Sequence, residues 1–238
     1  MSVARDMSCK LVINSCASYS VWLTRLMTSL KIHAVNLADV IVVKGCSASD
    51  VEPCRRWLND CEVTVIESQG NHYDFNGLCA LYKYLYHSLI VGTGYILIHD
   101  TCEATATLPS AMKRLDFSDP NIVYVPPPPA ANICAVGRGV LVRMSDASAF
   151  RAVVSKRQAM DVEHGRSRES PPVHTYGRRV SIRSRRRCGV DKMADEMRLT
   201  FFYPDFGIYK FVTMQPFKGK SRVNVTGHDT PQDAVPSI

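Results

Sequence analysis

The first hundred residues alternate short, mainly apolar runs with segments in which apolar side chains recur at three- and four-residue intervals. The short runs, rich in β-branched residues, predict strands over 10–14, 39–44, 62–67 and 95–99. The helical spacing predicts helices over 18–32, 50–58 and 74–89. Parallel strands need long crossover connections, so this alternation predicts an α/β fold with a mostly parallel, Rossmann-like central sheet flanked by helices.

The second half of the chain is less regular. We expect a strand over 121–125, which stops at four prolines, and a helix over 146–160. The stretch 133–144 is apolar but broken by glycine, and the segments 199–203 and 208–214 are aromatic and β-like. Few large apolar residues follow, so we expect a single domain over 1–214 and a flexible tail over 215–238.

Polar and small residues stand at the carboxyl end of each of the first four predicted strands. These ends read Asn14-Ser15-Cys16, Lys44-Gly45-Cys46, Glu67-Ser68-Gln69 and His99-Asp100-Thr101-Cys102. In open α/β sheets, ligands bind beyond the carboxyl ends of the strands. The pattern therefore predicts one ligand site along this edge.

The composition is that of a globular domain with a basic excess. The 238 residues are 46% hydrophobic and 21% charged, with a net charge of +7. No apolar run reaches the roughly 18 to 20 residues that span a bilayer, and no signal-peptide core is seen. Nine cysteines at irregular spacing, without a C-x-x-C pair, favour free thiols in a reducing compartment. We expect a cytoplasmic protein with no membrane span.

Asp100 carries the most informative chemistry. A carboxylate at the end of a buried strand suits a divalent cation that bridges a diphosphate, since such a cation takes oxygen ligands and keeps several waters. The alternative is that Asp100 only caps the next turn.

Two further motifs accompany it. One is Glu67 to Leu78 (ESQGNHYDFNGL); the other joins Arg178-Arg179 to the later run Phe-Tyr-Pro-Asp-Phe-Gly-Ile-Tyr-Lys that ends at Lys210. Together with Asp100-Thr101, and over about residues 9 to 214, they resemble the small glycosyltransferases of the type A fold, most closely compact forms encoded by large DNA viruses. Each motif is short, and their order carries the resemblance.

The resemblance implies a nucleotide-binding half at about 9–105 and an acceptor half at about 106–214. It implies transfer of a sugar from a nucleoside-diphosphate donor to a glycan or glycoprotein acceptor, in the host cytoplasm if the chain is viral. Asp100 would bind Mn²⁺ or Mg²⁺. The family motif is Asp-x-Asp, but here Cys102 takes the third position as a soft ligand or as none. Glu103, His164 or His174 could assist, or arginines could neutralise the diphosphate without metal.

By the same resemblance, a larger set of residues would contact the donor: Ser15, Ser18, Glu67, Asn71, Asp74, His99, Thr101, Arg178, Arg179 and Lys210. The serines would meet base or ribose, and the arginines and lysine would meet phosphate. Helix capping is the alternative role for Ser15 and Ser18, and for Asp74 or Asn76. Asp100 is expected to act in catalysis as well as in metal binding.

Glu163 is the candidate base. In an inverting reaction a carboxylate at this position could take the proton of the acceptor hydroxyl. A helix that ends before Gly165 explains the same letters.

Two other functions stay open. Eight arginines lie between Arg166 and Arg187, which is compatible with binding a nucleic-acid backbone. The tract lacks the interleaved aromatic residues of a stacking platform, which disfavours that reading, and we expect Arg183 to Arg187 to form a solvated loop. The third possibility is a catalytically inactive relative, for which Cys102 is the best support.

Overall fold

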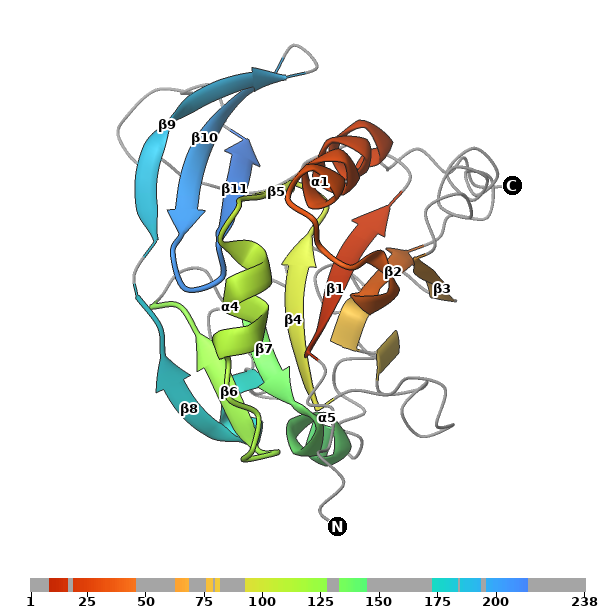
Figure 1. The fold of residues 1–238 in the computed structure, drawn as a ribbon, viewed down its shortest axis with the longest axis vertical. Helices are drawn as coiled ribbons and strands as arrows, with labels where there is room; N and C mark the ends of the chain where they lie inside the picture. The colour runs from red at the N-terminus through yellow and green to blue at the C-terminus, as the bar shows by residue number, and fades with distance from the viewer. Residues whose placement is uncertain are drawn as a thin grey trace, which may run out of the picture.

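The computed structural model of the chain describes residues 9–16, 19–45, 63–68, 76–78, 80–81, 93–127, 133–144, 173–183, 185–193 and 196–213 (Figure 1). Its strands are β1 Cys9–Cys16, β2 Val40–Gly45, β3 Thr64–Ser68, β4 Gly94–His99, β5 Cys102–Ala104, β6 Ile122–Val125, β7 Cys134–Gly137, β8 Arg178–Ser181, β9 Arg186–Met193, β10 Glu196–Tyr203 and β11 Ile208–Thr213. Its helices are α1 Ser20–Ile32, α4 Leu108–Arg114 and α5 Arg138–Met144, with 3-10 turns η2 Leu37–Asp39 and η5 Val173–Tyr176.

The central sheet has seven strands in the order β3-β2-β1-β4-β7-β6-β8. β1 pairs in parallel with β2 and β4, β2 with β3, and β6 with β8. Among these strands β7 alone runs against its neighbours. The predicted α/β fold with a mostly parallel central sheet is confirmed.

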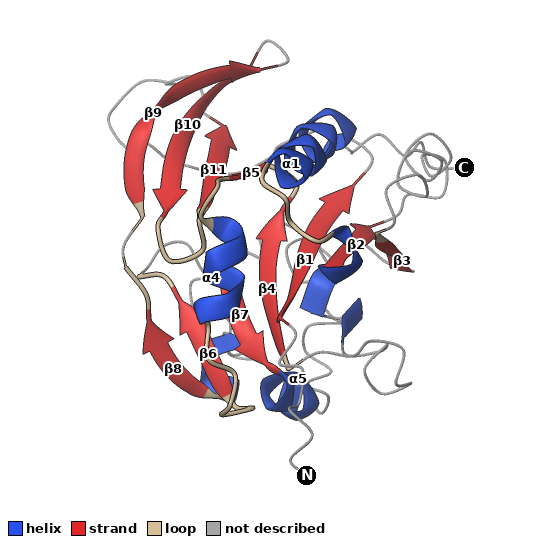
Figure 2. Cartoon of the chain, in the orientation of Figure 1, coloured by secondary structure: helices blue, strands red, loops and turns tan. Residues whose placement is uncertain are grey.

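Helical segments cover both faces of this sheet (Figure 2). One buried cluster joins α1 and α4 to one face, through residues such as Leu26 and Leu108 against Leu11 and Ile13. A second cluster joins α5 and the helical residues 76–78 and 80–81 to the other face. Every residue of β2 and of β4 is therefore buried, which is why these strands read as continuous apolar runs rather than as alternating ones.

A second sheet of four antiparallel strands, in the order β5-β11-β10-β9, lies beside the first. The chain enters it directly from β4 through the turn residues Asp100 and Thr101. Leu199, Phe201 and Ile208 on its inner face join the cluster that holds α1 and α4. The two sheets therefore share one core, and the turn between β4 and β5 lies at their junction.

Helix α1 shows how the sequence pattern determines packing. Trp22, Leu23, Leu26, Met27 and Leu30 recur at helical spacing, and all five are buried. Val21, which the spacing alone would also place on the apolar stripe, is 54% exposed. The helix begins at Ser20 after Tyr19, with no side-chain hydrogen bond at its N-cap, so burial of the apolar face rather than capping stabilises it.

The later elements depart further from the expectation. The apolar stretch 133–144 divides into strand β7 and helix α5. Strand β5, helix α4 and strand β9 were not anticipated. The predicted helices over 50–58 and 146–160, and most of that over 74–89, lie outside the described residues.

The solvated loop expected over Arg183 to Arg187 is corrected in part, since Arg183, Arg186 and Arg187 are exposed but the last two lie in a strand. Arg186 and Arg187 begin β9. Arg183 pairs with Asp205 at 2.6 Å, and the Arg185 guanidinium lies 4.1 Å from the centroid of the Phe201 ring. Neighbouring acidic and aromatic side chains thus hold Arg183 and Arg185 against the second sheet.

The structure describes two features that the sequence analysis considered, the length of the helices and the state of the cysteines. The helices in the described part of the chain include none long and apolar enough to cross a membrane. Five cysteines in it, Cys9, Cys16, Cys102, Cys134 and Cys188, are free thiols.

Candidate active site at the carboxyl edge of the parallel strands

The turn between β4 and β5 is held by both sheets. The backbone N–H of Asp100 donates to the carbonyl of Asn14 on β1 at 3.0 Å, which continues the β1–β4 ladder by one residue. The carbonyl of Thr101 accepts from the N–H of Phe211 on β11 at 2.9 Å, where the β5–β11 ladder begins. Asp100 and Thr101 are therefore fixed at the corner where the chain passes from one sheet to the other.

The Asp100 carboxylate is buried, with 4% of the residue exposed. It accepts hydrogen bonds from the Ser15 hydroxyl and from the backbone N–H groups of Cys16 and Thr101. Burial raises the pKa of Asp100 from 3.8 to about 7, although Lys210 and these three donors oppose the rise. Asp100 is a carboxyl group whose charge changes near neutral pH.

Lys210 reaches the same corner from β11. It is 7% exposed, and its ammonium donates to the Thr101 hydroxyl at 2.7 Å. Its charge lowers the pKa of Asp100, which places the two groups within electrostatic range of each other. Ser15, Asp100 and Lys210 thus come together from β1, the corner turn and β11.

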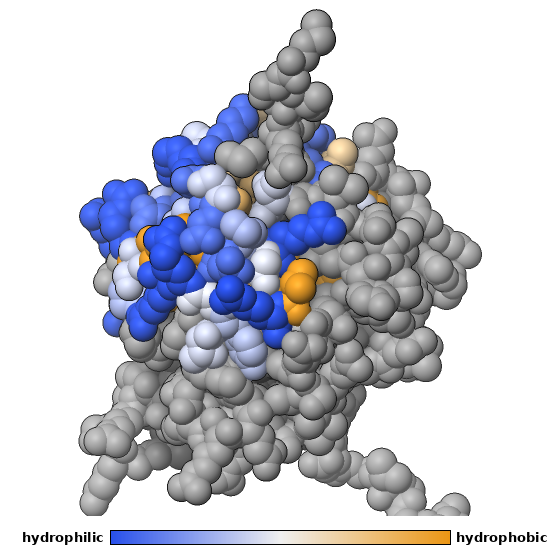
Figure 3. Space-filling view, turned by 90° about the horizontal axis from the view of Figure 1, so that it is seen from below, coloured by the Kyte–Doolittle hydropathy of each residue, from blue (hydrophilic) through white to orange (hydrophobic). Residues whose placement is uncertain are grey.

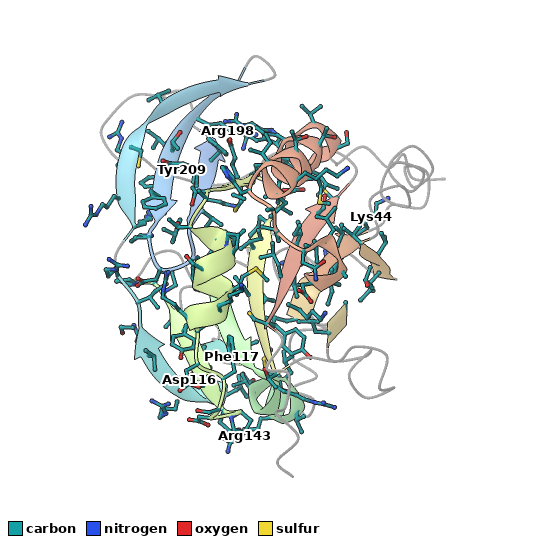
Figure 4. The ribbon with its side chains drawn as sticks, viewed as in Figure 1. Lys44, Asp116, Phe117, Arg143, Arg198 and Tyr209 are labelled. Carbon is teal, nitrogen blue, oxygen red and sulfur yellow. The ribbon has the colours of Figure 1, made fainter. Side chains whose placement is uncertain are left out.

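A row of polar positions continues across the neighbouring strands. Ser15 is the register partner of Lys44 on β2, and Lys44 is the partner of Glu67 on β3. Register partners on parallel strands lie on the same face of a sheet. Lys44 is 3% exposed, so a second buried cation lies along this edge, in the upper half of the view in Figure 4. The sequence pattern placed Lys44 among the polar strand ends but gave its charge no role.

His99 lies on the other face of the sheet. It is the register partner of Asn14, which precedes Ser15 on β1, and successive strand residues point to opposite faces. A Cβ atom added at Gly77 would lie 2.6 Å from the Asn14 side-chain oxygen, so Asn14 faces the helical residues 76–81. The structure separates His99 from the Ser15, Asp100 and Lys210 group.

Cys102 and Glu103 do not complete a cation site with Asp100. Cys102 is fully buried among apolar residues, and burial raises the pKa of its thiol. The Glu103 carboxylate pairs with Arg25 of α1. The described residues contain no group of three His, Cys, Asp or Glu side chains that could hold a metal ion. Among these described groups, a divalent cation at the corner would therefore have Asp100 as its protein ligand and would take its other oxygen ligands from water and phosphate.

Comparisons with known proteins give only distant likenesses. No protein-family model and no curated protein matches the chain. Among solved structures it is similar to S. aureus TarS, at 12% identity and a TM-score of 0.45 over 75% of this chain and 36% of that one. A mannosyltransferase from Pyrobaculum calidifontis, PcManGT with GDP-Man and Mn²⁺, matches at 14% identity and a TM-score of 0.44 over 73% of this chain and 54% of that one.

GalNAc-T7 with UDP, GalNAc and Mn²⁺ matches at 16% identity and a TM-score of 0.40, over 52% of this chain and 23% of that one. The chain therefore spans between about a quarter and a half of the length of these structures. Likenesses of this strength assign neither a substrate nor a site residue to this chain.

Arg178 and Arg179 lie away from the Asp100 corner. They begin β8, which is separated from β4 by β7 and β6. Since β6 and β8 run parallel to β4, the start of β8 lies at the opposite edge of the sheet from Asp100. There Arg178 pairs with Asp119 at 2.8 Å. Figure 4 shows nearby Asp116 at the lower end of the molecule, and Figure 3, seen from below, shows mainly hydrophilic described residues.

Several expected site residues lie outside the described residues: Ser18, Asn71, Asp74, Glu163 and His164. The backbone positions of Glu67 in β3 and of His174 in η5 are described, and their side chains are not. The roles given to these residues stay predictions.

Proposed function

We propose that the protein transfers a glycosyl group from a nucleoside-diphosphate sugar to an acceptor at the carboxyl edge of β1, β2 and β4. The observation that carries the proposal is the buried group of Ser15, Asp100 and Lys210 at the corner between the two sheets. Parallel α/β sheets bind ligands beyond the carboxyl ends of their strands. The resemblance of the sequence motifs to small glycosyltransferases supports the same reaction, with a glycan or glycoprotein as the acceptor.

The electrostatics of the edge suit an anionic donor. Among the described buried groups there, Lys44 and Lys210 carry positive charge and Asp100 is the one carboxyl group. During transfer, the bond between the sugar C1 and the diphosphate oxygen breaks and its electron pair stays on that oxygen. Fixed positive charge next to the leaving diphosphate stabilises the developing anion.

Asp100 and Ser15 have a second role in this proposal. An ionised carboxylate offers about four acceptor positions, and donors among the described residues occupy three on Asp100. A further position would accept a hydroxyl of the ribose or of the sugar. Because Ser15 and two backbone N–H groups hold the carboxylate, it meets the donor in one orientation.

The acceptor proton needs a base, and Glu163 remains the proposed one for an inverting reaction. The new bond forms between the acceptor oxygen and C1, and the carboxylate takes the hydroxyl proton. Ser18, Glu67, Asn71 and Asp74 remain proposed donor contacts. Arg178 and Arg179 are not included, because β8 begins at the opposite edge of the sheet.

A divalent metal, Mn²⁺ or Mg²⁺, was also expected with the donor. When bound, such an ion would neutralise the diphosphate as a Lewis acid. Beyond Asp100, its ligands would have to come from the diphosphate, from water and from residues outside the described ones, since Cys102 is buried and Glu103 is paired.

A second candidate function, binding of a polyanion such as nucleic acid, is favoured by one observation. Arg179 on β8 and Arg186 and Arg187 on β9 are exposed on edge strands of the two sheets. Such a surface contacts phosphates without reading sequence. It leaves the buried group at the Asp100 corner without a role, so we rank it second.

The experiment is thermal unfolding of the protein with UDP-, GDP-, TDP- and CMP-sugars, followed by a product assay with the sugar that binds. A ligand specific for the native state stabilises it by about 2.7 kcal/mol at 100 times its Kd. We expect a shift with one nucleotide, its loss in Asp100→Ala, and its retention in the surface control Asp116→Ala. Binding without turnover would indicate an inactive relative. No shift with any donor, together with salt-sensitive binding of DNA or RNA, would replace the first function by the second.

A further inference from the structure

A lysine ammonium, rather than a further carboxylate, lies near Asp100 at the corner. Lys210 is buried on β11, and its Nζ atom lies 2.7 Å from the hydroxyl of Thr101, the residue that follows Asp100. Thr101 is itself 1% exposed and its backbone is tied to Phe211, the residue after Lys210. Two contacts between the same short segments therefore fix the position of the ammonium relative to the corner.

The other groups at the corner oppose a second cation. The Asp100 carboxylate already accepts three hydrogen bonds from protein donors. The Thr101 hydroxyl oxygen accepts from Lys210. The thiol of Cys102, where the family motif has its second Asp, is buried among apolar side chains. A divalent ion here would meet one partly available carboxylate and a fixed positive charge.

We infer that Lys210 supplies the positive charge for the donor diphosphate, so that donor binding and transfer proceed without a divalent metal. The inference rests on the proposed function and assigns its cofactor requirement. The inference also explains why Cys102 stands at the third position of the motif. If Lys210 supplies the positive charge, this position needs no metal ligand, and a small apolar side chain can pack between β5 and β11 there.

The reaction balances with Lys210 as a hydrogen-bond donor only. The C1–oxygen bond of the donor breaks and its electron pair remains on the diphosphate, the acceptor oxygen bonds to C1, and the acceptor proton passes to a base. The ammonium keeps its proton throughout. It has three N–H donors, of which Thr101 accepts one, so it can donate to the diphosphate while still held at the corner.

The test measures affinity for UDP, GDP and TDP by calorimetry, in EDTA and then in excess Mn²⁺. We expect one nucleotide to bind the wild-type protein with the same affinity, within about threefold, in both buffers. Lys210→Met is expected to weaken that binding at least about tenfold, as loss of a hydrogen bond to a charged group does. The matched control Lys113→Met, on the exposed surface of α4, is expected to leave it unchanged.

If Lys210→Met is unfolded by circular dichroism, Thr101→Val replaces it, since that variant keeps the charge and removes the hydroxyl that positions it. We expect a weaker affinity in that variant, and an unchanged affinity would overturn the role of Lys210. Nucleotide binding that needs Mn²⁺ would overturn the inference and leave the proposed function standing. Absence of binding in both buffers would overturn both.

Discussion

Burial of the Asp100 carboxyl group has a measurable consequence for stability. Its pKa rises from 3.8 to about 7 on folding, with burial as the main cause. Between these values the unfolded chain has lost a proton that the folded chain still holds, so the free energy of unfolding falls as pH rises. The stabilising contribution is complete below pH 3.8 and is lost as pH rises through about 7.

The magnitude follows from the size of the shift. A rise of about three units corresponds to about 4 kcal/mol in total, at 1.36 kcal/mol per unit. About two of those units fall between pH 5 and pH 8, so about 3 kcal/mol of this contribution is lost across that range. Lys210, Ser15 and the N–H groups of Cys16 and Thr101 all lower the pKa, and this value already includes their effect.

The assay is urea unfolding of wild-type protein and Asp100→Asn at pH 5, 6, 7 and 8, in buffer containing EDTA. Asparagine does not titrate, so the difference in unfolding free energy between the two proteins removes the contributions of the other groups. We expect this difference, wild type minus variant, to fall by about 3 kcal/mol from pH 5 to pH 8.

The matched control is Asp116→Asn. Hydrogen bonds from Ser118 lower the pKa of that exposed carboxyl group, so it stays ionised over the whole range and the difference should be flat. Parallel pH profiles for wild-type protein and Asp100→Asn would show that Asp100 keeps an ordinary pKa, and would refute the reasoning from burial.

Three further substitutions test the packing by urea unfolding. Gly207→Ala should lower stability by about 2 to 4 kcal/mol, because Gly207 has φ +65° and an added Cβ would lie 2.6 Å from the backbone nitrogen of Leu108. Gly94→Ala should cost about 1 to 3 kcal/mol, since its Cβ would lie 2.2 Å from the Phe117 ring. Leu26→Ala should cost about 2 to 5 kcal/mol, because Leu26 is fully buried. A loss below about 0.5 kcal/mol, the usual range of surface substitutions, would contradict each.

The parallel part of the fold was predictable because its signals are local. The runs within β1, β2 and β4 are apolar at nearly every position, and burial on both faces requires that. The chain order of strands and helices then fixed the parallel pairing. Strand β5 has three residues, too few for any periodicity, and β7 is too short to be told from the start of helix α5, which follows it without a loop.

The sequence named Asp100 as the carboxylate of the candidate site, but it did not predict which side chains surround it. Asp100 and Ser15 follow from the rule that strand ends meet at one edge. The sequence could not place Arg178 relative to Asp100, because clustering of arginines along the chain says nothing about the direction of the strand that carries them. Arg178 pairs with Asp119 at the start of β8, at the edge of the sheet opposite Asp100.

The partner of Asp100 lies 110 positions later in the chain, and its place depends on a contact that no local pattern encodes. Lys210 reaches the corner because β5 leaves the turn at Thr101 and pairs with β11, in the register Lys210 with Cys102. A shift of that register by one residue would turn Lys210 to the opposite face of β11 and bring Tyr209 or Phe211 to the face that Lys210 now occupies. The aromatic contacts of that opposite face oppose such a shift, since Phe211 packs against Trp22 of α1 with ring centroids 5.3 Å apart and Tyr209 against Phe202 at 5.1 Å. The chemistry of the corner is therefore determined by the packing of aromatic rings on the other side of the same strand.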